Sequence, residues 1–212
     1  MAIKTDEVIN NIYILQSRNV RKLLKVKTSL LRDINRNSKL NNISDVEIKT
    51  KMYSLLYSAW SEAQFVQILH TPNALFPRDI KDIEEEKKKN GIINGWKLLI
   101  TLAIEKVGDI DKSDDLSKRK ETIINIITNH VEQPSILRNK IAHGQWVHAL
   151  NREHTKESTS FTDNLTNLDY VKIDILFKIH EFLGAIMRDL VQSPKKSFHT
   201  PLCQHSCPKL MI

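Results

Sequence analysis

The fold class is decided by residues 44–72, SDVEIKTKMYSLLYSAWSEAQFVQILHTP. Apolar residues recur here every three or four positions, which is the period of one helical face. Ser44 and Glu47 match the capping box that starts a helix, and Thr71-Pro72 ends the pattern. We therefore predict one long helix that ends near His70, with an apolar stripe of Met52, Leu55, Leu56, Ala59, Ala63, Val66 and Leu69.

Helical patterns continue on both sides of this stretch. Before it, a basic N-terminal segment (1–36) contains a predicted helix at 6–34, and a polar connection follows at 36–43. The stretches 145–150 and 159–162 hold β-compatible residues and are consistent with a small β-hairpin. We predict an all-α helical bundle in one domain, residues 1–194, with its core in 45–194 and a C-terminal tail at 195–212. The remaining helices are expected at 78–90, 96–107, 121–131, 134–143 and 168–191, with an acidic loop at 108–115.

The composition agrees with a folded, mainly helical protein. The 212 residues are 41% hydrophobic and 27% charged, with only 5 Gly and 6 Pro. These values exclude a disordered chain, and they disfavour an all-β sandwich because its turns use Gly and Pro. The sequence holds no Gly-rich phosphate loop and no G-x-S-x-G motif. No apolar run approaches the ~20 residues of a membrane span, and the first residues include acidic ones, so we expect a cytoplasmic protein without membrane contact.

Residues 137–146, LRNKIAHGQW, combine side chains that suit phosphodiester chemistry. A Pro and a Gly bracket a short helix, 134–143, on which Asn139 and His143 are four residues apart and share a face. A histidine can act as acid or base near neutral pH, and Arg138 beside it can stabilise a phosphorane-like transition state. The structural alternative is a helix-end His bonded to a local backbone carbonyl and an Arg in a surface ion pair.

The pattern R-N-x-x-x-H followed by Gly resembles the motif of the HEPN superfamily (higher eukaryotes and prokaryotes nucleotide-binding). Arg138, Asn139 and His143 match it position by position. The order of elements agrees, because the family has a bundle of four or five helices with the motif at the end of a late helix and one long helix after it. The segments after the motif and at the end of the last helix look like the stand-alone RiboL-PSP-HEPN proteins of bacterial defence and toxin systems. The resemblance covers about residues 45–194.

The resemblance implies a metal-independent endoribonuclease that uses no cofactor and acts as a homodimer, in which two motifs meet in one composite cleft. His143 would be the acid and base for attack of a ribose 2′-OH on the adjacent phosphate, giving a 2′,3′-cyclic phosphate and a 5′-OH end. Arg138 would hold the phosphate, and Asn139 would orient the histidine or the substrate. Glu62, the lone carboxylate of residues 52–77, would pair with Arg138; its alternative is an exposed place on a polar face.

The resemblance also bears on partners and on the alternative function. Toxin branches of the family usually carry a Tyr two residues after the His, which an antitoxin modifies, whereas this chain has Gln145. Control by that modification is not expected, although an antitoxin or another regulatory protein is still a partner that the family implies. The alternative is a non-catalytic HEPN module that binds nucleotide or RNA, or dimerises with another protein. The intact Arg138, Asn139 and His143 favour the enzyme.

Positive charge is concentrated near the N-terminus. The net charge of the chain is +7, and residues 1–51 hold 11 Lys and Arg against 5 Asp and Glu. We predict a surface there that attracts RNA phosphates, the alternative being a solvated helix face. The predicted RNA-binding residues are Arg18, Arg21, Lys22 and Lys25 on the first helix, and Lys140 and Trp146 near the motif. The indole ring of Trp146 can stack on a base, the alternative being a contact with the core or with the hairpin.

The tail holds side chains of metal-ligand types, namely His199, Cys203, His205 and Cys207. Two cysteines separated by three residues do not have a usual zinc-finger spacing. We therefore expect no bound metal.

Overall fold

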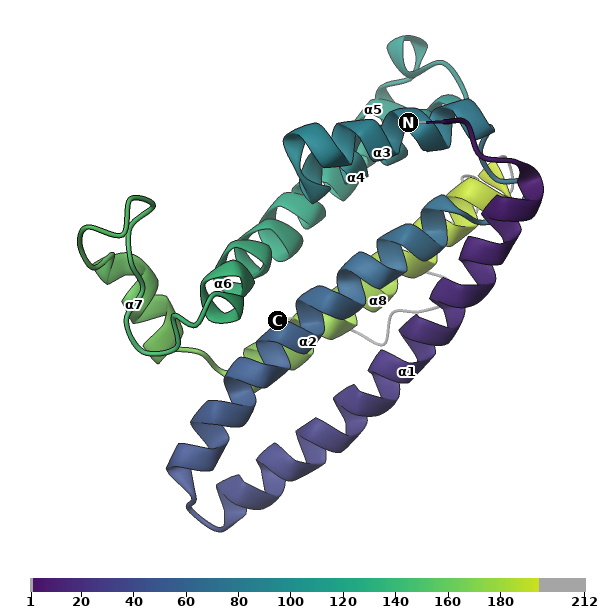
Figure 1. Cartoon of the computed structure of the whole chain (residues 1–212). Coiled ribbons are helices and arrows are strands. Elements are labelled where there is room, and N and C mark those ends of the chain that lie inside the picture. The colour runs from purple at the N-terminus through teal and green to yellow at the C-terminus, as the bar shows by residue number, and fades with distance from the viewer. Residues whose placement is uncertain (1, 195–212) are drawn as a thin grey trace.

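The structure is a computed structural model that describes residues 2–194, and it is helical nearly throughout (Figure 1). This confirms the predicted all-α fold class. The predicted tail with its His and Cys residues lies outside the described residues. The elements are α1 (Asp6–Lys39), α2 (Ile43–Leu69), α3 (Pro77–Asn90), α4 (Ile92–Glu105), the 3-10 helix η1 (Ile110–Lys112), α5 (Asp114–Ile127), the π-helix η2 (Thr128–Glu132), α6 (Gln133–Ala142), α7 (Thr159–Thr166) and α8 (Tyr170–Gln192).

Helix α2 is the centre of the bundle. It packs against α1, which runs antiparallel to it, and against α8, which runs beside it (Figure 1). The continuous run of α5, η2 and α6 lies on the other side of α2 from α1, and α3 and α4 lie over one end of the bundle (Figure 1). The motif helix α6 therefore contacts the middle of the most buried helix.

The apolar side chains form three clusters. The largest joins α2, α3, α4, α5 and α8 and includes Phe65, Trp96 and Met187. A second joins α1, α2 and α8, where the rings of Tyr53, Tyr57 and Trp60 surround Phe177 with centroid separations of 5.1, 5.1 and 5.3 Å. A small third cluster, Ile141, Ala149 and Leu165, joins α6 to the loop that follows it and to α7. The third cluster holds the motif helix to its neighbours.

The β-hairpin predicted after the motif helix is wrong. Residues 159–162 begin α7, and strand pairing in the described chain is limited to one isolated bridge between Leu150 and Glu157. The β-compatible residues of this stretch misled the prediction, because Phe161 and Leu165 are four apart and pack on one helical face against the third cluster. Tertiary packing overrides the local preference here.

The turn between α1 and α2 also differs from the prediction. Helix α1 continues to Lys39, five residues beyond the predicted end, because Ile34 and Asn37 are buried and extend its packed face. Helix α2 begins at Ile43, so Ser44 lies inside the first turn and the predicted capping box is not formed. Asn42 is the N-cap and makes no side-chain capping bond.

The predicted acidic loop is shorter than expected as well. Its last two residues, Asp114 and Asp115, form the first turn of α5, where acidic side chains are favoured by the helix dipole. Ser113 caps this helix by accepting a hydrogen bond from the backbone N–H of Leu116. Within residues 2–194, the helices are either too short or too polar to cross a membrane.

Candidate active site

A proline and a π-helix set the direction of the motif helix. Pro134 has no N–H to give to the carbonyl of His130, four residues earlier, and a regular α-helix would crowd its ring against that carbonyl. The chain adopts the wider π-helix at 128–132 instead, and the Tyr57 hydroxyl donates a hydrogen bond of 2.8 Å to the His130 carbonyl. Burial raises the pKa of Tyr57, so the hydroxyl stays protonated and remains a donor. Helix α2 thus anchors the start of α6.

The end of α6 is fixed by a Schellman motif. His143 is the C-cap, and Gly144 has a φ of +80°, a backbone conformation that favours glycine. The N–H of Gly144 donates to the carbonyl of Ile141 at 3.1 Å, and the N–H of Gln145 donates to that of Lys140 at 3.0 Å. The predicted boundaries of this short helix are therefore correct to within one residue, and His143 lies at its very end.

Arg138 faces α2 and forms an ion pair with Glu62 through its Nη2 atom. The two side chains are 30% and 37% exposed, so the pair lies at the edge of the protein interior and solvent can reach it. The Nε–H of Arg138 is buried and finds no acceptor within the described part of the chain. The expected contact between Glu62 and Arg138 is confirmed, and it holds the guanidinium in one orientation.

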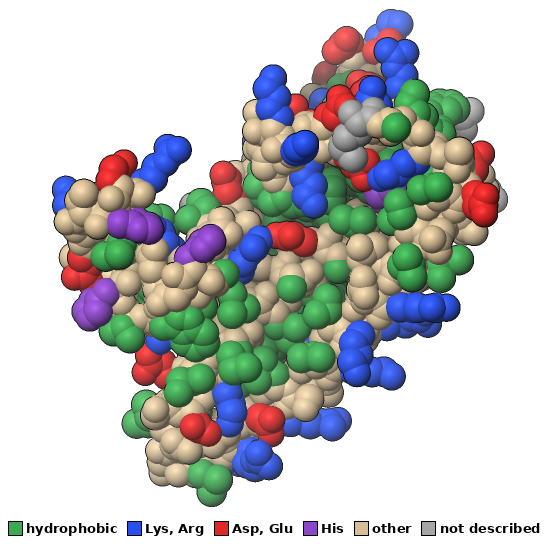
Figure 2. Space-filling view, viewed as in Figure 1, with side chains coloured by type: hydrophobic (Ala, Val, Ile, Leu, Met, Phe, Trp, Pro, Cys, Tyr) green, Lys and Arg blue, Asp and Glu red, His purple; other side chains and the backbone are tan. Residues whose placement is uncertain are grey.

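His143 and Asn139 lie on a different side of α6, one turn apart, and both are exposed. Neither side chain makes a hydrogen bond to another residue among positions 2–194. The structural alternative is therefore formed in one half only: Arg138 is in an ion pair near the surface, but the histidine makes no bond to a local backbone carbonyl. The imidazole and the amide are both open to a ligand from solvent. Figure 2 shows several histidine side chains on this part of the surface, around α6, α7 and the loop between them.

Lys140 and Trp146, which were predicted to bind RNA, are half-buried and make contacts within the protein. The Lys140 ammonium donates to the carbonyl of Leu150 at 2.5 Å and lies 5.3 Å from the centre of the Phe161 ring. Trp146 is half-buried and packs against the third cluster. The Gln145 side chain accepts a hydrogen bond of 2.7 Å from the Leu150 backbone. These contacts hold the loop at 145–158 against α6.

The cations predicted on the first helix are far from the motif. Arg18, Arg21, Lys22 and Lys25 are exposed on α1, and α1 and α6 lie on opposite sides of α2 (Figure 1). The structure therefore brings Glu62 to Arg138 but does not bring the basic residues of α1 to the same place. In residues 2–194, His, Cys, Asp and Glu side chains do not gather in a group that could hold a metal ion.

Part of the apolar stripe predicted for α2 is exposed and forms an apolar ridge with Ile48. Ile48, Met52 and Ala59 are exposed, are spaced by four and seven residues, and lead along one side of α2 toward Glu62, whereas Val66 beyond it is partly buried against the largest cluster. Ile48 and Met52 are each 46% exposed, and hydrophobic side chains show on this face in Figure 2. The signal was present in the sequence, since α2 has apolar residues on all sides, and such a helix is usually buried all round.

Comparison with family models, with curated proteins and with solved structures finds no match to this chain. The candidate site is therefore described by its own geometry: an oriented guanidinium, an open imidazole and an open amide at one helix end.

Proposed function

We propose that the protein is a metal-independent endoribonuclease whose active site is the end of α6. The observation that carries the proposal is that the two motif residues differ in their contacts. Arg138 is oriented by an ion pair with Glu62, whereas the His143 side chain, about one and a half turns away, is exposed and makes no hydrogen bond to another described residue. The R-N-x-x-x-H resemblance to HEPN ribonucleases supports the same assignment.

The chemistry uses only groups of the protein and the RNA. His143 accepts the proton of a ribose 2′-OH, and the 2′-oxygen attacks the adjacent phosphorus while the bond to the 5′-oxygen breaks. The leaving 5′-oxygen takes up a proton, so the products are a 2′,3′-cyclic phosphate and a 5′-OH end. Arg138 neutralises the non-bridging oxygens as negative charge develops on them. Glu62 is a positioning residue for the guanidinium, and Asn139 orients the imidazole or the ribose.

Two protomers complete the site in this proposal. One motif supplies one histidine, whereas the reaction needs a base for the 2′-OH and an acid for the leaving oxygen. A two-fold axis would bring a second His143 into the same cleft. The exposed apolar ridge of α2 passes beside Glu62 and supports an interface there. An antitoxin or another regulatory protein would then control the dimer, and the substrate would be a cytoplasmic RNA.

The test is to map the ends that the purified protein produces. RNA of mixed sequence is incubated in EDTA, and the cut ends are sequenced after treatments that distinguish cyclic phosphate from free phosphate. We expect cyclic phosphates and 5′-OH ends, and no cutting where the nucleotide 5′ of the scissile bond is 2′-deoxy. Activity that needs added Mg²⁺ would contradict the metal-free scheme. RNA that is bound but not cut would favour the non-catalytic module.

A further inference from the structure

The outer face of α1 carries a row of six basic residues, interrupted once by a serine, that the proposed active site does not use. The positions follow one another by four and three residues in turn, so they form one ridge along the helix. All seven are exposed. They are Arg18, Lys22, Lys25, Ser29, Arg32, Arg36 and Lys39.

The segment that contains the ridge accounts for the net charge of the chain. Residues 18–39 hold eight Lys and Arg against one Asp, a difference of +7, and the whole chain has a net charge of +7. The rest of the chain is therefore neutral in sum. The positive charge is carried by one helix and mostly by one side of it.

The ridge points directly away from the protein. The packed face of α1 includes Val20, Ile34 and Asn37, which are buried. Each of these precedes a ridge residue by two positions, or about 200° around the helix. Lys27 shows the contrast, because it lies on the packed side and binds Asp174 and Glu181 on α8 at 3.3 and 3.5 Å. Figure 2 shows Lys and Arg side chains projecting along the edge formed by α1.

The ridge cations are almost free of internal partners. Arg36 pairs with Asp33 at 3.0 Å, and the other ridge cations have no carboxylate partner among the described residues. Like charges three or four residues apart destabilise a helix. Helix α3 is different, since its glutamates at 84–86 precede lysines at 87–89 and the two signs offset each other. A bound polyanion would offset the repulsion on α1.

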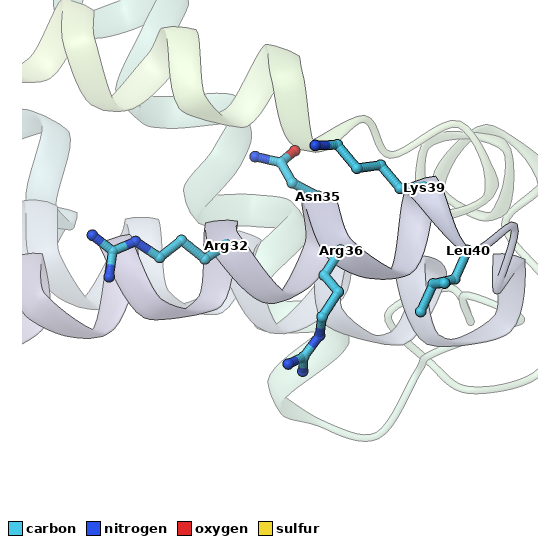
Figure 3. A pocket seen from close by; sticks show the side chains of 5 residues that line it. All are labelled: Arg32, Asn35, Arg36, Lys39 and Leu40. Carbon is cyan, nitrogen blue, oxygen red and sulfur yellow. The ribbon is translucent and has the colours of Figure 1, made fainter.

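The last turns of the ridge form a shallow basic depression. Arg32, Asn35, Arg36 and Lys39, with Leu40, line a volume of about 420 Å³ (Figure 3). Arg32, Arg36 and Lys39 carry only hydrogen-bond donors, and Asn35 adds an amide N–H2 beside its carbonyl oxygen. Cationic donors of this kind bind the oxygens of a phosphate group.

We infer that the α1 ridge binds the sugar–phosphate backbone of RNA as an anchor remote from the cutting site. The ridge is about 31 Å long, which corresponds to roughly nine nucleotides at the rise of a duplex. A regular row of flexible cations matches a regular row of phosphates and carries no sequence preference. The inference rests on the proposed function, since it takes RNA as the substrate, and it adds that long RNA is held at a second place.

A membrane surface fits the ridge less well. A helix that lies on a lipid bilayer inserts the apolar face opposite its cations. In α1 that face is already packed against α2 and α8. The exposed side offers cations but no aromatic anchor, because Tyr13 is the one aromatic residue of the helix.

The distance between the ridge and α6 predicts different effects on long and short RNA. Helices α1 and α6 are separated by α2 (Figure 1), so a short oligonucleotide at His143 does not reach the ridge. The ridge should therefore raise the affinity for long RNA and leave the cleavage of short RNA unchanged.

The test compares two variants with the same loss of charge. One replaces Lys22, Lys25, Arg32 and Lys39 with Gln on the ridge. The control replaces Lys88, Lys89, Lys118 and Lys172 with Gln; these lysines are also exposed but lie on α3, α5 and α8. Both are made in a His143→Ala background, so that binding is measured without cutting. Binding of RNAs of about 30 and about 5 nucleotides is measured against salt concentration, because each single-strand phosphate contact adds about 0.7 to the salt slope.

We expect the ridge variant to lower the slope for the long RNA by about 2 to 3, and the control to lower it by less than one. The short RNA should show little change in either variant. Equal slopes in the wild type and the ridge variant, or equal losses in the ridge variant and the control, would overturn the inference. So would binding to phosphatidylserine vesicles in preference to RNA. The experiment measures binding and not cleavage. It therefore tests the inference even if the protein does not cut RNA.

Discussion

The two sides of α2 are built from different contacts. Toward α8, the rings of Tyr53, Tyr57 and Trp60 enclose Phe177, and all four are buried. Toward α6, Glu62 forms a half-exposed ion pair, and the apolar ridge beside it is open to solvent.

If the proposed function holds, the contacts that stabilise the fold and those that serve the reaction lie on different sides of one helix. Packed aromatic rings contribute several kcal/mol of stability, whereas a solvent-exposed ion pair contributes about 0–1 kcal/mol. Changes on the α8 side should therefore unfold the protein, and changes on the α6 side should leave the fold intact while they alter assembly or activity.

The largest effect on stability is expected for Phe177→Ala. It removes a fully buried ring that touches three others, and the loss of packing costs about 3–5 kcal/mol in the free energy of unfolding. Urea denaturation measures it. Phe182→Ala on the same helix is the control, because that ring is 40% exposed and its loss should cost less than about 1 kcal/mol. Equal losses would contradict the comparison.

The buried His180 on α8 should make the free energy of unfolding depend on pH. Burial lowers the pKa of His180 from 6.5 to about 3, so between these values the unfolded chain binds a proton that the folded chain does not. Stability therefore falls as the pH falls below 6.5, by about 2 kcal/mol at pH 5. Urea denaturation at pH 7 and pH 5 should show this loss, and His180→Leu should remove it.

Carboxylates should not mask this result. Burial tends to raise the pKa of Asp174, but the hydrogen bond from Tyr53 and the charge of Lys27 together lower it. The stabilisation from such a group is complete above its ordinary pKa of 3.8 and is lost only as the pH falls further. An equal loss of stability between pH 7 and pH 5 in His180→Leu would show that another group titrates.

Tyr57→Phe tests the hydrogen bond that connects the aromatic core on the α8 side of α2 to the π-helix before α6. The ring stays in the core, but the hydrogen bond to the His130 carbonyl in the π-helix is lost. A buried polar group without its partner costs about 1–2 kcal/mol. Amide hydrogen exchange should rise first at 128–138, where α6 begins. Tyr13→Phe is the control, since its hydroxyl makes no hydrogen bond within residues 2–194, and a uniform rise in exchange across the protein would count against a local anchor.

The smallest effect on the fold is expected on the apolar ridge of α2. Met52→Glu puts a charge on a side chain that is 46% exposed, so the free energy of unfolding of the protomer should change by less than about 0.5 kcal/mol. A charge buried in the proposed dimer interface is costly, so light scattering should show a larger monomer fraction for this variant than for the wild type. Val171→Glu on α8, at a residue 51% exposed, should leave the dimer intact. A wild-type monomer that cuts RNA would remove the composite site.

Much of the order of helices follows from the sequence, because the repeat of apolar residues and the helix-ending Pro and Gly residues indicate the same boundaries. Helices α3 and α6 lie within one residue of their predicted bounds, and α8 within two, since Pro and Gly residues mark their ends and apolar positions repeat between them. The segment 145–166 could not be predicted in the same way. Its conformation depends on contacts of Lys140 and Gln145 with the Leu150 backbone, and such contacts leave no periodic signal.

Some features of the candidate site were also predictable from the sequence, and others were not. The residues of the motif and the bracketing Pro134 and Gly144 were sufficient to predict a histidine at a helix end. The pairing of Arg138 with Glu62 was expected only from the resemblance to the HEPN family, because no local pattern relates two residues on different helices. The anchor from Tyr57 to the His130 carbonyl was not predictable, because it depends on the π-helix that Pro134 requires. The separation of the α1 cations from α6 also needed the packing of three helices, which no local pattern contains.

The most direct test of the central claim is single-turnover cleavage of one RNA in EDTA by wild type, His143→Ala and His148→Ala. His148 is the matched control: it lies five residues further on, its side chain is 69% exposed, and it pairs with Glu157 on the same part of the surface. We predict that His143→Ala lowers the cleavage rate by about 100-fold or more and that His148→Ala leaves it nearly unchanged. A His143→Ala protein that is folded and cuts RNA at the wild-type rate would contradict the assignment of the end of α6 as the active site.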